Sequence, residues 1–288
     1  MFALKNQILY TSLNGAVVLP KEESFNAHIV SNTYENGQGV ITFDAPLVEI
    51  LAEAFYGQGF LTGIILPEGL ERIGDLAFMG TSLTSITIPP SVVEIGCSAF
   101  CNCPELEKFD GKFASADGRC LVVDGALKAI ATLGLTEYII PDGVEVICSD
   151  VLSDGLDLEH LILPSSVKRI EGSAFSDASG LDELTLNEGL ERLDAFAFED
   201  CANIERIVIP STVTEVGSPI FYSCFGLEEL VILPIVPPSV SEECDGEGHL
   251  WGDDIEVRII VPQSSVEAYR TAPMWRNYAS MIVGDKEA

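Results

Sequence analysis

Eight cysteines are the residues of this 288-residue chain that could do redox or metal chemistry. Cys103, Cys201 and Cys224 occupy one position of a repeated segment, where Gly155 and Ala178 stand in other copies. A position that accepts Cys, Ala and Gly requires a small, largely apolar side chain, which is how a buried thiol behaves. We therefore expect the cysteines to be mainly unpaired packing residues, with Cys201 and Cys224 buried.

The histidines and cysteines do not combine into a recognisable zinc site. Cys101 and Cys103 lack a second cysteine pair at zinc-ligand spacing, and the three histidines, His28, His160 and His249, are scattered. The sequence has no nucleophile elbow, phosphate-binding loop or zinc-protease helix. We therefore predict a protein that is not an enzyme, with no catalytic, cofactor-binding or metal residues and no cofactor.

Carboxylates crowd into one Gly-rich stretch, Ser241–Asp254. Oxygen ligands of this kind could hold calcium, but their spacing is not that of a helix-loop-helix calcium site. A solvated loop is the favoured interpretation, and cation binding stays open as the alternative.

Acidic residues outnumber basic ones by 45 to 15, for a formal net charge of −30. Such a surface repels phosphate backbones and anionic membranes, so we expect no nucleic-acid partner. Solubility is the simpler explanation of the charge, and steering of basic partners is the functional one. No apolar run approaches the roughly 20 residues of a membrane helix, and the first residues lack the features of a signal peptide. A cytoplasmic location is therefore not excluded.

The strongest pattern is a dipeptide, Ala-Phe or a close variant, that recurs every 22 or 23 residues. The copies are Ala54-Phe55, Ala77-Phe78, Ala99-Phe100, Val151-Leu152, Ala174-Phe175, Ala197-Phe198 and Ile220-Phe221. The interval of 52 between Phe100 and Leu152 resolves into one regular period and a longer one. We therefore predict about eight repeats over residues 41–229, with an irregular longer repeat at 109–137.

Each regular repeat begins with a short apolar run, and several of these runs end at proline, as in Ile86–Pro89 and Ile207–Pro210. Alternating β-branched residues before proline predict a short strand, and the Ala-Phe segment has room for only one helical or 3-10 turn. One coil cannot bury its own apolar side chains, so successive coils must stack. The expected fold is a repeat solenoid, a leucine-rich-repeat-like right-handed coil, with the Phe residues in one buried ladder.

The two ends of the array require different chemistry because an open end exposes strand edges. Residues 1–40 are polar-rich and break the period, which predicts an N-terminal cap, and residues 230–288 are expected to form the terminal repeat and a strand-helix cap. Within this cap, Ile255–Pro262 is the predicted last strand, and Ser264 with Glu267 predicts a capping box for a helix.

The middle residue of each strand is expected on the outer face of the sheet, because its neighbours point inward. These residues are Thr42, Ile65, Thr87, Ile139, Ile162, Thr185 and Val208. β-propensity on an exposed face is the simpler explanation, and a shallow binding surface is the functional one. The segment Phe109–Leu135 interrupts this row and is expected to project as a second recognition element.

The pattern strand-Pro-x-x-Val-x-x-Ile-Gly-x-x-Ala-Phe-x-x-Cys-x-x-Leu, best seen at Ile86–Leu106 and Ile207–Leu227, resembles the BspA-like leucine-rich-repeat family of bacterial surface proteins. The resemblance spans roughly Ile41 to Ile282, with Pro in place of the usual Asn ladder. It implies a secreted or surface protein that binds host matrix or other bacterial surface proteins. It transfers no binding residues.

We therefore expect a non-enzymatic protein-binding scaffold, a bacterial cell-surface or secreted adhesion module that is monomeric and does not insert into membranes. Two alternatives stay open because a repeat fold serves many functions. One is a carbohydrate-binding surface module, which the two Trp residues support poorly. The other is a structural spacer within a larger surface protein.

Overall fold

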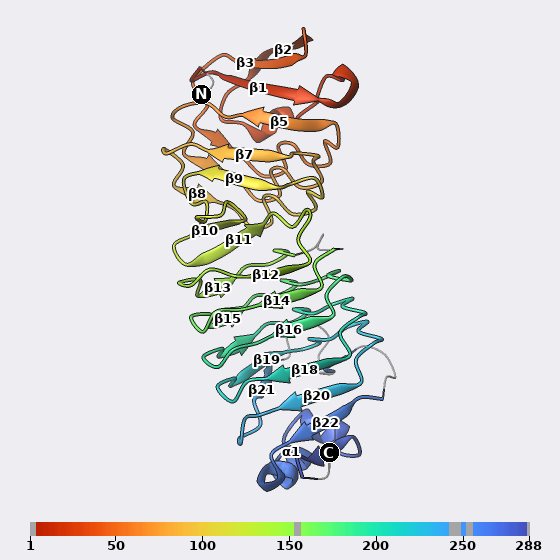
Figure 1. Cartoon of the computed structure of the whole chain (residues 1–288). Helices are drawn as coiled ribbons and strands as arrows, with labels where there is room; N and C mark the ends of the chain where they lie inside the picture. The colour runs from red at the N-terminus through yellow and green to blue at the C-terminus, as the bar shows by residue number, and fades with distance from the viewer. Residues whose placement is uncertain (1–3, 153–156, 242–248, 252–255, 287–288) are drawn as a thin grey trace. The chain divides into compact units, whose positions relative to one another are not determined.

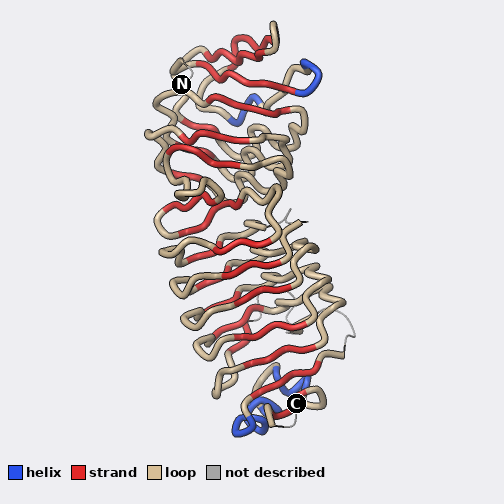
Figure 2. Tube along the Cα trace, viewed as in Figure 1, coloured by secondary structure: helices blue, strands red, loops and turns tan. Residues whose placement is uncertain are grey.

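The computed structural model describes residues 4–152, 157–241, 249–251 and 256–286. The chain divides into two compact units, Met1–Gly134 and Leu135–Ala288. Within each unit, short strands from successive turns lie side by side and are joined by turns and loops (Figures 1 and 2). This arrangement confirms the predicted repeat solenoid. Among the described residues, no helix has the length and hydrophobicity that a membrane span requires.

The N-terminal unit is built almost entirely of short strands. They are β1 Gln7–Ser12, β2 Ile29–Glu35, β3 Gln38–Phe43, β4 Glu49–Ile50, β5 Leu61–Ile65, β6 Arg72–Ile73, β7 Ser85–Ile88, β8 Glu94–Ile95, β9 Lys108–Gly111, β10 Cys120–Val123 and β11 Ala126–Ile130. Two 3-10 turns, η1 Leu13–Gly15 and η2 Glu22–Ser24, follow β1. Strands β2-β3-β1-β5 form one sheet, β7-β9 a parallel pair, and β4-β6-β8 a second parallel sheet.

The start of the chain inserts a strand that the repeat pattern does not contain. β1 lies between β3 and β5 and is antiparallel to both. β2 and β3 form a hairpin whose two turn residues, Asn36 and Gly37, both have positive φ, as a tight two-residue turn requires. β3 extends over residue 40, where the boundary between the N-terminal cap and the repeats was expected. The position of that boundary stays a prediction.

The irregular repeat forms a second hairpin, β10-β11, around a turn at Asp124 and Gly125. Leu121 and Leu127 are fully buried, and Leu121 belongs to the same core cluster as Phe109. The expectation that Phe109–Leu135 projects is therefore wrong. Its apolar residues fold the hairpin back onto the N-terminal unit, because exposing them would forfeit their burial energy.

The C-terminal unit stacks its strands in two rows. The outer row is β12 Glu137–Ile139, β14 His160–Ile162, β16 Glu183–Thr185, β18 Arg206–Ile209, β20 Glu229–Ile232, β22 Arg258–Val261 and β23 Ile282–Gly284. The second row is β13 Val146–Ile147, β15 Arg169–Ile170, β17 Arg192–Leu193, β19 Glu215–Gly217 and β21 Ser239–Ser241. Hydrogen-bonded neighbours pair in parallel register. The outer row is interrupted between β16 and β18, which belong to two different sheets. Prolines such as Pro210 end strands of the outer row, since proline cannot continue the ladder.

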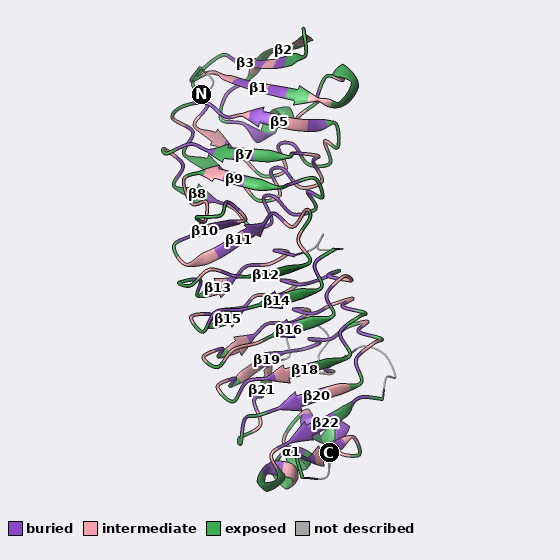
Figure 3. Ribbon diagram, in the orientation of Figure 1, coloured by how far each residue is buried: buried purple, intermediate pink, exposed green. Residues whose placement is uncertain are grey.

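Phenylalanine ladders fill the core of both units. In the N-terminal unit the Phe78 ring stacks on Phe55 and Phe100, with ring centroids 5.2 and 5.3 Å apart. In the C-terminal unit Phe198 stacks on Phe175 and Phe221, at 5.7 and 5.4 Å. All six rings are buried, and buried residues alternate with exposed and half-buried ones along the chain of both units (Figure 3). The expected single ladder is thus two ladders, one in each unit.

The C-terminal cap combines η3 Gln263–Ser265, α1 Val266–Thr271, η4 Trp275–Tyr278 and strand β23. The predicted capping box is wrong: Ser264 lies in η3, and the N-cap of α1 is Ser265, which makes no side-chain cap bond. Strand β23, which sequence analysis missed, pairs with β22. Trp275 and Tyr269 are buried and donate hydrogen bonds of 2.8 Å to the carbonyls of Pro238 and Pro234, which anchors the cap.

Candidate functional site

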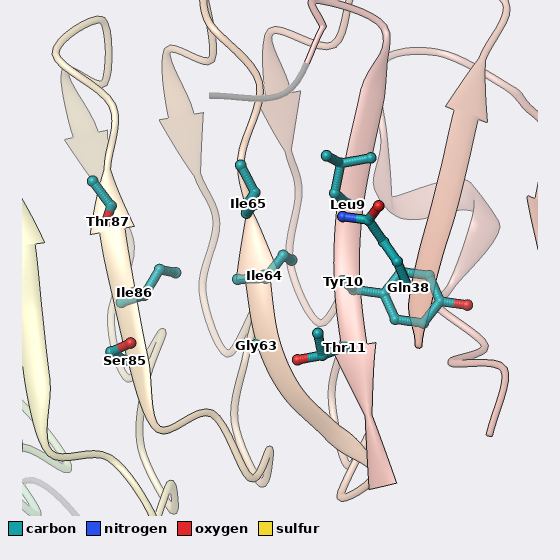
Figure 4. Close-up of a pocket in the computed structure, with 10 residues that line it drawn as sticks. All are labelled: Leu9, Tyr10, Thr11, Gln38, Gly63, Ile64, Ile65, Ser85, Ile86 and Thr87. Atoms are coloured by element: carbon teal, nitrogen blue, oxygen red, sulfur yellow. The ribbon is translucent and has the colours of Figure 1, made fainter. Parts of the chain in front are cut away.

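The outward sheet face of the N-terminal unit contains a hollow of about 360 Å³. Leu9 and Thr11 of β1 line it together with residues of β5 and β7 and with Gln38 (Figure 4). Gly63 leaves space there, because a Cβ atom at this position would lie 2.6 Å from the Thr11 Oγ1. None of the ten lining residues is charged. The hollow therefore offers hydroxyl, amide and aliphatic groups only.

The structure brings together two of the three outward residues predicted in this unit. Ile65 and Thr87 both line the hollow. Thr42 does not join them, because β1 lies between β3 and β5: Gln7 pairs with Thr42, and Leu9 pairs with Ile65. Sequence analysis missed the lining residues of β1 because this strand precedes the repeats, although its alternating pattern was a signal for a strand.

The outward residues of the C-terminal unit form a row that is hydrogen-bonded from β12 to β16 and interrupted between β16 and β18. Ile139 pairs with Ile162, and Ile162 pairs with Thr185, in adjacent parallel strands. Ile139 is 65% exposed and Ile162 is 40% exposed. Val208 is half-buried and pairs with the buried Val231. The exposed apolar part of the row therefore lies at β12 and β14.

A column of four carboxylates runs beside this row. Its members, one in each turn and each just before a strand of the outer row, are Glu159, Asp182, Glu205 and Glu228, called here the acidic column. Backbone hydrogen bonds join two pairs of successive turns at this level, from Asp182 N–H to the Glu159 carbonyl at 2.9 Å and from Glu228 N–H to the Glu205 carbonyl at 2.8 Å. The side chains are all exposed.

The acidic column is not neutralised by the rest of the described chain. The next residues in sequence do form ion pairs: Glu183 lies 3.6 Å from the His160 imidazole, and Glu229 lies 3.3 Å from the Arg206 guanidinium. Within the described ranges, no basic group lies within 4.0 Å of a carboxylate of the acidic column. Like charges stacked at strand spacing repel one another, so this edge carries an uncompensated negative potential.

A groove of about 860 Å³ passes along the acidic column. Asp182, Glu205 and Glu228 line it, and Phe225, whose side chain is 65% exposed, forms part of its wall. Gly226 also lines the groove, and a Cβ there would lie 2.0 Å from the Ala202 carbonyl oxygen, so glycine allows this turn to approach the preceding one closely. His160 and Arg206 also line the groove, and each lies beside a carboxylate, that of Glu183 or Glu229. The groove thus combines an excess of carboxylates with one exposed aromatic ring, a combination that suits a cationic ligand with an apolar part.

The repeat position that holds Cys103, Cys201 and Cys224 forms a ladder of thiol hydrogen bonds. The thiols of Cys201 and Cys224 donate to the carbonyls of Phe175 and Phe198, at 3.1 and 2.7 Å, and the Cys103 thiol donates to Phe78 at 3.2 Å. Thr81 stands at the same repeat position and donates to the Phe78 carbonyl at 2.9 Å. The position thus requires a small side chain. Where that side chain carries a thiol or hydroxyl group, the group also donates a hydrogen bond to a buried backbone carbonyl.

A profile for the BspA type leucine rich repeat region matches the sequence in six copies, over residues 32–115 and 128–237. This chain belongs to the BspA-type leucine-rich-repeat family. The family assignment confirms the resemblance inferred from the Ile-Gly and Ala-Phe pattern. The matched residues include the phenylalanine ladders of both units and the small-residue position three residues after most of the rings.

Solved structures resemble the BspA-type fold of this chain. A leucine rich cell surface protein from Faecalibacterium prausnitzii A2-165 is 22% identical, with a TM-score of 0.56, over 81% of this chain and 55% of that one. The pneumococcal vaccine antigen PcpA is 18% identical, with a TM-score of 0.45, over 81% of this chain and 74% of that one. This chain thus spans about half of the Faecalibacterium protein. No curated protein matches the sequence significantly.

Burial makes the thiols of the BspA-type ladder unreactive. It raises the pKa of the Cys201 thiol well above its ordinary value and that of Cys224 to about 12, so both are protonated at neutral pH. Cys97 is exposed. We expect a thiol reagent to modify Cys97 rapidly in the folded protein and to recover most of the eight thiols after denaturation without reductant. Recovery of none would show that the cysteines are not packing residues.

The histidines, which are the remaining candidate metal ligands, lie in different parts of the chain. His28 lies before β2 and His160 in β14, and His249 belongs to another loop. Among the described residues, no group of three or more His, Cys, Asp or Glu side chains could hold a metal ion. Most of the acidic stretch 241–254, including residues 242–248, lies outside the described residues.

Proposed function

We propose that this chain is a non-enzymatic protein-binding scaffold whose C-terminal unit binds a basic protein through its outward face. The observation that carries the proposal is the uncompensated acidic column beside the exposed Ile139 and Ile162. Aliphatic side chains and carboxylates together suit a protein surface that presents lysine or arginine around an apolar contact.

The distribution of charge supports the choice of this unit. Residues 1–134 contain seven basic and 15 acidic residues, for a net charge of −8, and residues 135–288 contain eight basic and 30 acidic residues, for −22. A basic partner is therefore attracted mainly to the C-terminal unit, and complementary charge accelerates its association.

The remaining predicted binding residues belong to the same proposal. Thr185 and Val208 extend the row in the C-terminal unit, and Ile65 and Thr87 offer a neutral second surface in the N-terminal unit. Thr42, which β1 separates from them, is the weakest member of the set.

A secreted or cell-surface location is part of the proposal, with a host matrix protein or another bacterial surface protein as the partner. The family and the description of the Faecalibacterium relative as a cell surface protein support it. The carbohydrate-binding alternative needs exposed aromatic platforms. Both Trp251 and Trp275 are buried, whereas Tyr56 and Tyr222 are exposed and are the candidate platforms for that alternative. The spacer alternative predicts no ligand.

Binding of the purified chain to immobilised matrix proteins, bacterial surfaces and glycans tests this function. We expect binding to basic proteins that weakens as salt rises from about 0.01 to about 1 M, because the screening length falls from about 30 to about 3 Å. Binding to glycans alone would favour the carbohydrate alternative. Binding to no member of the panel would favour the spacer.

A further inference from the structure

Strand β2 is an open edge of the N-terminal unit. It stands at the end of the sheet β2-β3-β1-β5 (Figure 1), and among the described strands it pairs with β3 alone. The strand is seven residues long, Ile29–Glu35. A strand of this length with one free side presents a row of backbone donors and acceptors to another strand.

The register shows which backbone groups are free. In a hairpin with a two-residue turn, the flanking residues Glu35 and Gln38 form a hydrogen-bonded pair, and the pairs alternate from there. Asn32 and Tyr34 fall in the non-hydrogen-bonded pairs, so their N–H and C=O groups point away from β3. Within the part of the chain that the structure describes, nothing hydrogen-bonds these backbone groups.

β2 lacks most of the features that protect an edge. Natural edges are guarded by lysine, proline or a short strand, and β2 contains no lysine or proline. Its one irregularity is a register shift between Ile29 and Ser31, near the start of the strand. By contrast, β23 at the end of the C-terminal unit is three residues long and is followed by the charged Asp285 and Lys286.

We propose that β2 pairs with β2 of a second copy of this chain, antiparallel and centred on Asn32. The outward backbone groups of Asn32 and Tyr34 then find partners across a two-fold axis. In this register Ser31 faces Thr33 of the second copy and Val30 faces Tyr34, which are favourable hydroxyl and β-branched–aromatic pairs. The one charged residue, Glu35, faces Ile29, so no like charges meet.

The distribution of charge favours self-association through the N-terminal residues that include β2 rather than through the C-terminal unit. The first 48 residues contain two basic and four acidic residues, whereas the C-terminal unit has a net charge of −22. Two copies therefore repel each other least where the β2 edges meet. The proposal goes beyond the proposed binding function and does not rest on it. The monomer expected from the sequence is the competing outcome.

Sedimentation velocity over a range of concentrations tests this pairing. We expect the wild-type chain to shift to twice the monomer mass as concentration rises. Ser31→Lys/Thr33→Lys places lysines opposite each other across the two-fold axis, and it should require at least about tenfold more protein to dimerise. The matched control, Ser85→Lys/Thr87→Lys, makes the same changes on exposed residues of β7 and should dimerise like the wild type. A monomer at all concentrations, or equal dimerisation of the two variants, would overturn the proposal.

Hydrogen exchange provides a second measurement that is independent of the variants. The amide protons of Asn32 and Tyr34 should become protected when concentration favours the dimer, while those of Ser31 and Thr33, already paired with β3, should change little. A dimer in which the Asn32 and Tyr34 amides stay unprotected would use another surface and would also overturn the proposal.

Discussion

Phe198→Ala should lower the free energy of unfolding by about 3–5 kcal/mol, since it removes a large side chain from a closely packed core. The Phe198 ring is 0% exposed and stacks between the rings of Phe175 and Phe221. Its loss leaves a cavity that breaks the ladder of the C-terminal unit in the middle. Chemical denaturation and the melting temperature measure the effect.

The matched control is Phe225→Ala, the same chemical change in the same unit at a ring that is 65% exposed. We expect this variant to unfold within about 1 kcal/mol of the wild type, because little apolar area is lost from the interior. Equal midpoints for Phe198→Ala and the wild type would show that the ring is not part of the core.

Gly217→Ala should destabilise the chain by about 1–3 kcal/mol or more. A Cβ at Gly217 would lie 2.0 Å from the backbone nitrogen of Ala195 and 2.4 Å from the carbonyl carbon of Asp194. These are backbone atoms of the preceding turn, so relief requires moving one turn of the coil away from the next. The loss should appear in the denaturation midpoint.

Glu171→Ala is the control for this substitution. Glu171 follows the strand residue Ile170, as Gly217 follows Val216, but its turn already accommodates a Cβ. Its truncation should change stability by no more than about 0.5 kcal/mol. If Gly217→Ala proved equally neutral, the close approach of the turns at this position would be refuted.

Much of the fold follows from the spacing of a few residues. The recurrence of Ala-Phe predicted that the phenylalanine rings stack, because rings at the same position of successive turns stack when the coils do, although it predicted one ladder where there are two. Proline after several of the apolar runs predicted where those strands end. The outward orientation of Ile139 and Ile162 followed from the twofold alternation of side chains along a strand.

Features that depend on segments outside the repeat could not be predicted. β1 inserts between β3 and β5, and no periodicity shows where a strand that precedes the array will pair. The capping box failed because the chain continues through a 3-10 turn before α1 begins. The acidic column is different, because its members lie within the repeat and recur every 23 residues, a spacing that the sequence itself contains. Only the structure shows that these four carboxylates have no basic partner among the described residues.

Two double variants that place aspartates on exposed positions test the central claim that the outward row of the C-terminal unit binds protein. Ile139→Asp/Ile162→Asp removes the exposed apolar part of the row. The control, Ile235→Asp/Val236→Asp, makes an equivalent change at residues that are 70% and 77% exposed elsewhere in the unit. Added carboxylates by themselves favour a basic partner, so lost binding would report the lost apolar contact.

The decisive measurement is the dissociation constant of each folded variant for the protein ligand that the wild-type chain binds in the panel. The account predicts at least about tenfold weaker binding for Ile139→Asp/Ile162→Asp, a loss of about 1.4 kcal/mol, and wild-type affinity for the control. Unchanged affinity of Ile139→Asp/Ile162→Asp would contradict the account.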